Sequence, residues 1–221
     1  LSADDSNGGV ITQSFTVAVS VTHLDIDGTS GFRILSSPIS GAIYSDLLDE
    51  LWTQGAVGSD HEGADPNIWT YNDGWNPVTN LNTDVLAAGQ SFVVYVFSDT
   101  DYDGDDDLPV TISVDGTPDQ TGVTVAANPS KWNLIGNPYG LHVDVSQMLS
   151  DNNTRLERHN VYTLDHSNPG YRTHNGTIGD PQDGLIKPFD GFWIQTGATG
   201  DNFEFTEQSI RRGQITGNGR T

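Results

Sequence analysis

The chain has 221 residues, which is long enough for one large β domain or two smaller domains. It contains no cysteine, and this excludes disulfides, thiolate nucleophiles and thiolate metal sites. With 30 acidic and 9 basic residues, the formal net charge is −21. Such a charge argues against nucleic acid and anionic membranes as partners, and it favours cations or a basic protein. Since no apolar run is long enough to cross a bilayer, membrane insertion is not expected.

The charge is divided unevenly along the chain. Residues 1–130 hold 20 acidic residues and a single base, Arg33, whereas residues 131–221 hold 10 acidic and 8 basic residues. One interpretation is an acidic surface that keeps the protein soluble outside a cell. The other is recognition of a cation or a basic partner by the first half.

The chain begins with a polar, Gly-rich segment, residues 1–9, followed by an alternating run over residues 10–21. Alternation predicts a long strand, and one face would carry apolar side chains for contact: Ile11, Phe15, Val17, Val19 and Val21. Two interpretations remain open. The strand opens the first module, as residues 122–126 would open the second, or it adds to a neighbouring subunit as a donor strand.

The rest of the chain predicts an all-β fold, built of sandwich-like or barrel-like modules. Abundant Gly, Pro, Asn and Asp interrupt short runs of β-forming residues. Strands are expected at residues 31–36, 67–71, 91–97, 110–114, 122–126, 132–136, 160–164, 191–196 and 202–207. Short helical turns are expected at residues 44–52 and 145–149.

Three blocks recur in the same order at offsets of about 93 to 100 residues. Residues 32–38, 67–71 and 86–95 are matched by residues 132–138, 160–164 and 186–195. This pattern predicts an internal duplication. We therefore expect four parts: an N-terminal tail and strand (1–22), an acidic module (23–120), a second module (121–210) and a C-terminal tail (211–221).

One loop has the spacing of a calcium site. Asp residues alternate over residues 99–107 and are followed by Gly104, as in the opening of an EF-hand loop. The expected ligands are Asp99, Asp101, Asp103, Asp105 and Asp107. The match is partial, because Val110 stands where the bidentate Glu would be. The alternative is a solvated acidic loop.

Trp69, Trp75 and Tyr171 could form a sugar-binding surface, although such aromatic residues also supply core volume. No Ser lies in a nucleophile-elbow context, and no carboxylate pair is placed for glycoside hydrolysis. These observations predict a protein without enzymatic activity.

The run Lys-Trp-Asn-Leu-Ile-Gly-Asn-Pro-Tyr at residues 131–139 resembles a signature of β-rich modules in large secreted proteins of Bacteroidota-type bacteria. In those proteins the modules precede a type IX secretion sorting domain. Residues 160–164 and 186–194 continue the resemblance, with Pro-Phe-Asp-Gly-Phe where such modules often carry Pro-Gly-Gln-Gly-Phe. The resemblance implies export and a location outside the cell or on its surface.

Together these features predict an extracellular, non-catalytic structural or adhesive protein. Copies would assemble into a filament through their terminal strands, by head-to-tail contact, or the protein would bind a neighbouring surface protein. Calcium would stiffen the acidic loop. The alternative is a carbohydrate-binding accessory module.

Overall fold

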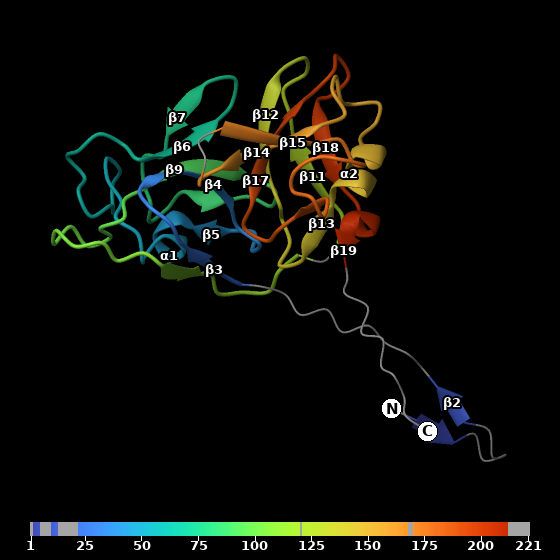
Figure 1. The fold of residues 1–221 in the computed structure, drawn as a ribbon, viewed down its shortest axis with the longest axis horizontal. Coiled ribbons are helices and arrows are strands. Elements are labelled where there is room, and N and C mark those ends of the chain that lie inside the picture. Colours follow the sequence, from blue (N-terminus) through green and yellow to red (C-terminus); the bar gives the residue numbers. More distant parts are fainter. Residues whose placement is uncertain (1, 5–9, 13–21, 120, 168–169, 212–221) are drawn as a thin grey trace.

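The structure is a computed structural model that describes residues 2–4, 10–12, 22–119, 121–167 and 170–211. It confirms the all-β class, because nearly every element is a strand and the sheets are antiparallel. Within these residues no sheet closes into a barrel, so each half is a layered arrangement of open sheets. Figure 1 shows the two halves of the chain side by side.

The first half contains a four-stranded sheet and two short strand pairs that pack over one of its faces. The sheet has the order β4 (Gly31–Ser36), β9 (Ser91–Val96), β6 (Ile68–Tyr71) and β7 (Trp75–Pro77). The covering elements are β3 (His23–Ile26) with β10 (Val110–Ser113), β5 (Ala42–Ile43) with β8 (Val85–Leu86), and helix α1 (Tyr44–Leu47).

The second half repeats this order of elements and pairings. Its sheet has the order β12 (Trp132–Gly136), β17 (Gly191–Gln195), β14 (Val161–Asp165) and β15 (Gly170–His174). The covering elements are β11 (Val123–Ala126) with β18 (Asn202–Phe205), β13 (His142–Asp144) with β16 (Leu185–Ile186), and helix α2 (Val145–Asp151). It also carries a 3-10 turn, η1 (Glu207–Ser209), and strand β19 (Ile210–Arg211).

Each half has its own hydrophobic core, and a third core lies between the halves. Side chains alternate along β4, so Leu35 points into the first core while Ile34 points to the opposite face. The third core joins Ile34 and Val93 to Leu134 and Trp193. The two sheets are therefore packed through faces that a single module would leave exposed.

Main-chain hydrogen bonds cross the boundary at equivalent positions. The amide of Ser36 donates to the carbonyl of Phe189 at 2.8 Å, and the amide of Gly136 donates to the carbonyl of Gly89 at 2.9 Å. The two donors, Ser36 and Gly136, are one hundred residues apart in the sequence, and so are the two acceptors, Gly89 and Phe189. The boundary therefore has an approximate two-fold relationship. The sequence blocks thus correspond to a repeated topology.

Phe189 departs from this symmetry. It belongs to the second half, yet its fully buried side chain lies in the core of the first half. Its φ is +68°, close to the +75° of Gly89 at the equivalent turn position. A Cβ on Gly89 would overlap the Cγ2 atom of Val125, so only the Phe189 side of the boundary has room for a ring.

The long strand expected over residues 10–21 is described only at β2 (Val10–Thr12), where Ile11 pairs with Ala3 of β1 (Ser2–Asp4). Phe15, Val17, Val19 and Val21 lie outside the described residues. The place in the first half that corresponds to β11 is occupied by β3, because β3 pairs with β10 as β11 pairs with β18. Here the structure differs from the expectation that residues 10–21 open the first module.

Candidate functional site

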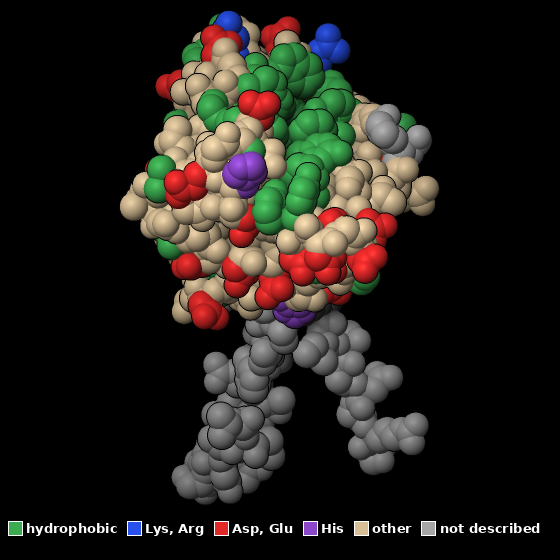
Figure 2. Space-filling view, turned by 90° about the vertical axis from the view of Figure 1, so that its left-hand side faces the viewer, with side chains coloured by type: hydrophobic (Ala, Val, Ile, Leu, Met, Phe, Trp, Pro, Cys, Tyr) green, Lys and Arg blue, Asp and Glu red, His purple; other side chains and the backbone are tan. Residues whose placement is uncertain are grey.

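One face of the first-half sheet carries a row of aromatic rings, which we call the aromatic stripe: Phe32, Trp69, Tyr95 and Phe97. Alternation along β4, β6 and β9 places the first three on the face opposite the first core. Phe32 contacts Trp69 and Tyr95 with ring centroids 6.1 and 5.1 Å apart, and Tyr95 contacts Phe97 at 5.0 Å. Figure 2 shows a band of hydrophobic side chains on the side of the molecule that carries the first half.

The stripe is exposed because the second half covers only part of this face. Ile34 and Val93 are buried against the second-half sheet, whereas Phe32, at the start of the same strand, is 50% exposed. The other three rings are partly exposed. Contiguous apolar surface of this kind is uncommon on a soluble protein unless it serves as a binding surface.

Trp75 extends the aromatic surface toward the boundary between the halves. It is 53% exposed and packs edge-on against Tyr71 and Trp193, with centroids 5.2 and 5.8 Å apart. The Nε1 of Trp193 and the Oε1 of Gln195 are buried without a hydrogen-bond partner. An unpaired buried donor or acceptor is destabilising, and both atoms are enclosed by the protein and not presented to a ligand at the surface.

The structure brings together two of the three residues expected to bind sugar. Trp69 and Trp75 lie on the adjacent strands β6 and β7. Tyr171 is 57% exposed, but it lies on β15 in the second half, and among the described residues no aromatic contact joins it to the other two. Sequence reasoning missed Phe32 and Tyr95, although the alternation along their strands was a usable signal.

The acidic loop between β9 and β10 brings three of the five expected ligands together. Asp99, Asp101 and Asp107 place carboxylate oxygens within 4.8 Å of one another. Asp103 and Asp105 do not belong to this triad. Instead, the carboxylate of Asp103 accepts a hydrogen bond from the amide of Asp105 at 3.0 Å.

The carboxylates also shape the loop. Asp99 accepts hydrogen bonds from the amides of Asp103 and Gly104 at 3.1 and 2.9 Å, and Asp107 accepts one from the amide of Thr100 at 2.7 Å. Gly104 has a φ of +108°, a conformation that favours glycine. The backbone thus wraps around carboxylates whose remaining lone pairs stay free for a ligand.

This donor set fits a hard divalent cation, for which oxygen ligands are preferred. Calcium takes six to eight oxygens, so three carboxylates would need water or backbone carbonyls beside them. Asp99, Asp101 and Asp107 would supply the charged part of the shell. The triad by itself does not select calcium over other hard cations.

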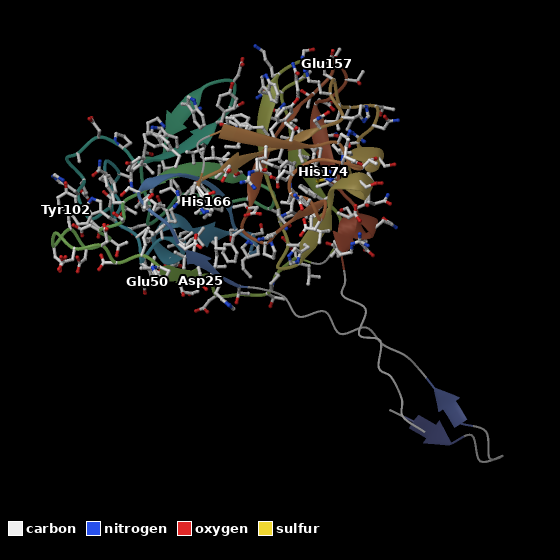
Figure 3. All side chains as sticks on the ribbon, in the orientation of Figure 1. Asp25, Glu50, Tyr102, Glu157, His166 and His174 are labelled. Atoms are coloured by element: carbon white, nitrogen blue, oxygen red, sulfur yellow. The ribbon has the colours of Figure 1, made fainter. Side chains whose placement is uncertain are left out.

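Aromatic stacking connects the loop to the body of the first half. Tyr102, at the tip of the loop, stacks on Trp52 with ring centroids 4.8 Å apart and an interplanar angle of 24°. Figure 3 shows Tyr102 at the outer edge of the molecule, far from the second half. A cation in the loop would therefore stiffen a segment that is already attached at its tip.

A cleft of about 390 Å³ lies at the boundary between the halves, near His166, which is labelled in Figure 3. On its wall, a hydrogen bond from the Ser167 hydroxyl, aided by the neighbouring Arg172, lowers the pKa of Asp165 to about 2. Burial raises the pKa of Asp190 to about 6. Asp190 accepts a hydrogen bond from the amide of Lys187, and so it holds the turn that carries Phe189.

No known protein-family model matches this chain. Nor does any curated protein or solved structure match it. In the described part of the chain, no helix has the length and apolar character that a membrane crossing requires.

Proposed function

We propose that this protein is an extracellular, non-catalytic structural or adhesive protein that assembles with other copies of itself. The observation that carries the proposal is the aromatic stripe, in which Phe32 is exposed and the other three rings are partly exposed. Exposed rings gain roughly 25 cal/mol for each Å² of apolar area that a partner covers. Because a sheet holds the rings in place before contact, little ordering opposes their association.

The charge distribution supports contact between unlike ends. The first half holds nearly all of the net negative charge, whereas most basic residues belong to the second half and the segment after it. Contact between two different surfaces is heterologous, and it produces open chains when the rotation does not close a ring. The acidic loop would bind calcium outside the cell. The resemblance to secreted Bacteroidota-type modules supports that location.

Sedimentation velocity at increasing protein concentration tests the assembly, first with calcium and then with a chelator. We expect concentration-dependent association that the double variant Phe32→Ala, Tyr95→Ala weakens at least tenfold. Val57→Ala is the matched control, because Val57 is also exposed, at 53%, but lies outside the stripe. A protein that stays monomeric at every concentration, with and without calcium, would refute the assembly.

Carbohydrate binding is the second candidate function, and the surroundings of Trp75 favour it. Its ring is exposed for stacking and is held in place by edge-on contacts with Tyr71 and Trp193. Sugars present an apolar face that can stack on such a ring. A glycan array should show binding that Trp75→Ala abolishes and Tyr171→Ala leaves intact. If neither variant changes the pattern, the surface around Trp75 is not the sugar site.

A further inference from the structure

The strands β5 and β13 occupy equivalent places in the two halves but have different neighbours. β13 pairs with β16 along one edge and with β19 along the other, so that Val143 lies opposite both Ile186 and Ile210 and is fully buried. Among the described residues, β5 pairs only with β8. Ala42, which pairs with Leu86 as Val143 pairs with Ile186, is only partly buried.

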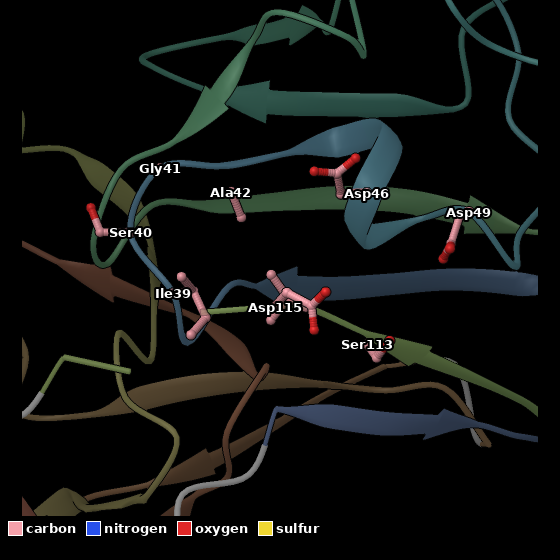
Figure 4. Close-up of a pocket in the computed structure, with 9 residues that line it drawn as sticks. Ile39, Ser40, Gly41, Ala42, Asp46, Asp49, Ser113 and Asp115 are labelled. Atoms are coloured by element: carbon pink, nitrogen blue, oxygen red, sulfur yellow. The ribbon is translucent and has the colours of Figure 1, made fainter. Parts of the chain in front are cut away.

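A cavity of about 430 Å³ borders the free edge of β5. Figure 4 shows it between Ala42, helix α1 and the end of β10. In the second half, the chain leaves β18, forms η1 against α2, and pairs with β13 as β19. Among the residues that the structure describes, the first half has no such segment, because the chain passes from β10 toward β11. The cavity thus lies where the second half places an additional strand.

The cavity is acidic. Exposed Asp46, Asp49 and Asp115 line it, and none of the described residues that line it is basic. The equivalent edge in the second half shows how such a strand is held electrostatically, because Arg211 of β19 forms an ion pair with Asp144 of β13 at 2.7 Å. A strand that adds to β5 would accordingly be favoured by basic residues.

We infer that the free edge of β5 binds residues 212–221 of a second copy as an added strand, an inference that rests on the proposed self-assembly. This segment contains Arg212 and Arg220 and no acidic residue, which complements the cavity. Within this segment, Ile215 and Thr216 are adjacent β-branched residues, a type that favours strands. Residues 1–21 are the competing segment, but they contain Asp4 and Asp5 and no base, so the acidic cavity disfavours them.

Strand addition suits an edge that is free on one side. Main-chain N–H and C=O groups along such an edge form hydrogen bonds with any extended segment, and side-chain pockets decide which segment binds. The donor segment follows β19 in the second half, whereas the acceptor edge lies in the first half. Each copy would thus donate at one place and accept at another, which links copies head to tail.

Cysteine cross-linking tests this contact, since the natural chain has no cysteine. One full-length protein would carry Ser40→Cys, beside the cavity, and a second would carry Gln214→Cys. The matched control replaces the first with Ser150→Cys, an exposed position on α2. After mixing and mild oxidation, we expect the mixed disulfide dimer to form at least tenfold faster with Ser40→Cys than with the control. Adding Asp46→Lys and Asp115→Lys to the Ser40→Cys protein should slow formation of the mixed disulfide dimer toward the control rate.

Equal rates with Ser40→Cys and the control would overturn the inference. So would a chain with both Ser40→Cys and Gln214→Cys that closes an internal disulfide at a rate independent of concentration, because the segment would then bind its own copy. Assembly in sedimentation without the specific cross-link would leave the proposed function standing and reject this contact. The specific cross-link from a protein that sediments as a monomer would support the contact and reject stable assembly.

Discussion

Ser36 and Gly136 are one hundred residues apart in the sequence and in direct apposition at the boundary between the halves. A Cβ on Gly136 would overlap the Cβ of Ser36 and would lie 2.8 Å from the carbonyl oxygen of Gln90. Gly191 has the same relationship to Ser91. Two small residues at each crossing allow the sheets to approach closely enough for the hydrogen bonds between Ser36 and Phe189 and between Gly136 and Gly89.

Gly136→Ala should therefore destabilise the protein by about 1 to 3 kcal/mol, the usual cost of overpacking a tightly packed site. Urea unfolding monitored by tryptophan fluorescence would measure the loss. The double variant Ser36→Gly, Gly136→Ala moves the Cβ to the other side of the crossing and should recover part of it. A single Gly136→Ala variant as stable as the natural protein would contradict the close approach.

Phe189→Ala should lower the free energy of unfolding by about 3 to 5 kcal/mol, as expected for the loss of a fully buried ring. Because this ring from the second half fills the core of the first, we expect both halves of the natural protein to unfold in one transition. Unfolding of each half can be followed by tryptophan fluorescence, because Trp52 lies in the first half and Trp193 in the second. Separate transitions for the two halves in the natural protein would show that Phe189 does not couple them.

Asp190 should make stability depend on pH in an unusual direction. Its folded-state pKa of about 6 lies above its ordinary value of 3.8, so the folded state binds the proton more tightly than the unfolded state. The stabilisation from this residue is then complete below about pH 4 and is lost as the pH rises through 6. At pH 7 we expect Asp190→Asn to be more stable than the natural protein by about 1 to 2 kcal/mol. Unfolding at pH 4 is the control, where the difference should disappear.

Calcium should stabilise the first half through the acidic loop. With millimolar calcium and a dissociation constant near 0.1 mM, the gain would be about 1 to 2 kcal/mol, following the logarithm of the ratio of calcium concentration to dissociation constant. Asp99→Asn and Asp107→Asn should abolish it, whereas Asp105→Asn, outside the triad, should retain most of it. Thermal unfolding with and without a chelator measures the effect. A shift equal in the natural protein and in Asp99→Asn would locate the calcium effect elsewhere.

The sequence determined the local elements well. Alternation and turn residues place β4 and β12 at their observed bounds, and the convergence of Asp99 and Asp101 follows from a spacing that is short enough to act within one loop. The order of the three repeated blocks also anticipated that both halves share one topology. All of these features depend on neighbours along the chain.

The tertiary structure alone decided which faces are covered. Alternation shows that Phe32 and Ile34 share a face, but it does not show that the second half buries Ile34 and leaves Phe32 exposed. It likewise gives no sign that β19 pairs with β13, whereas β5 has only β8 as a partner among the described residues. The physical reason is that burial depends on contacts between residues about a hundred positions apart, whereas sequence patterns report only the preferences of each segment for its own strand.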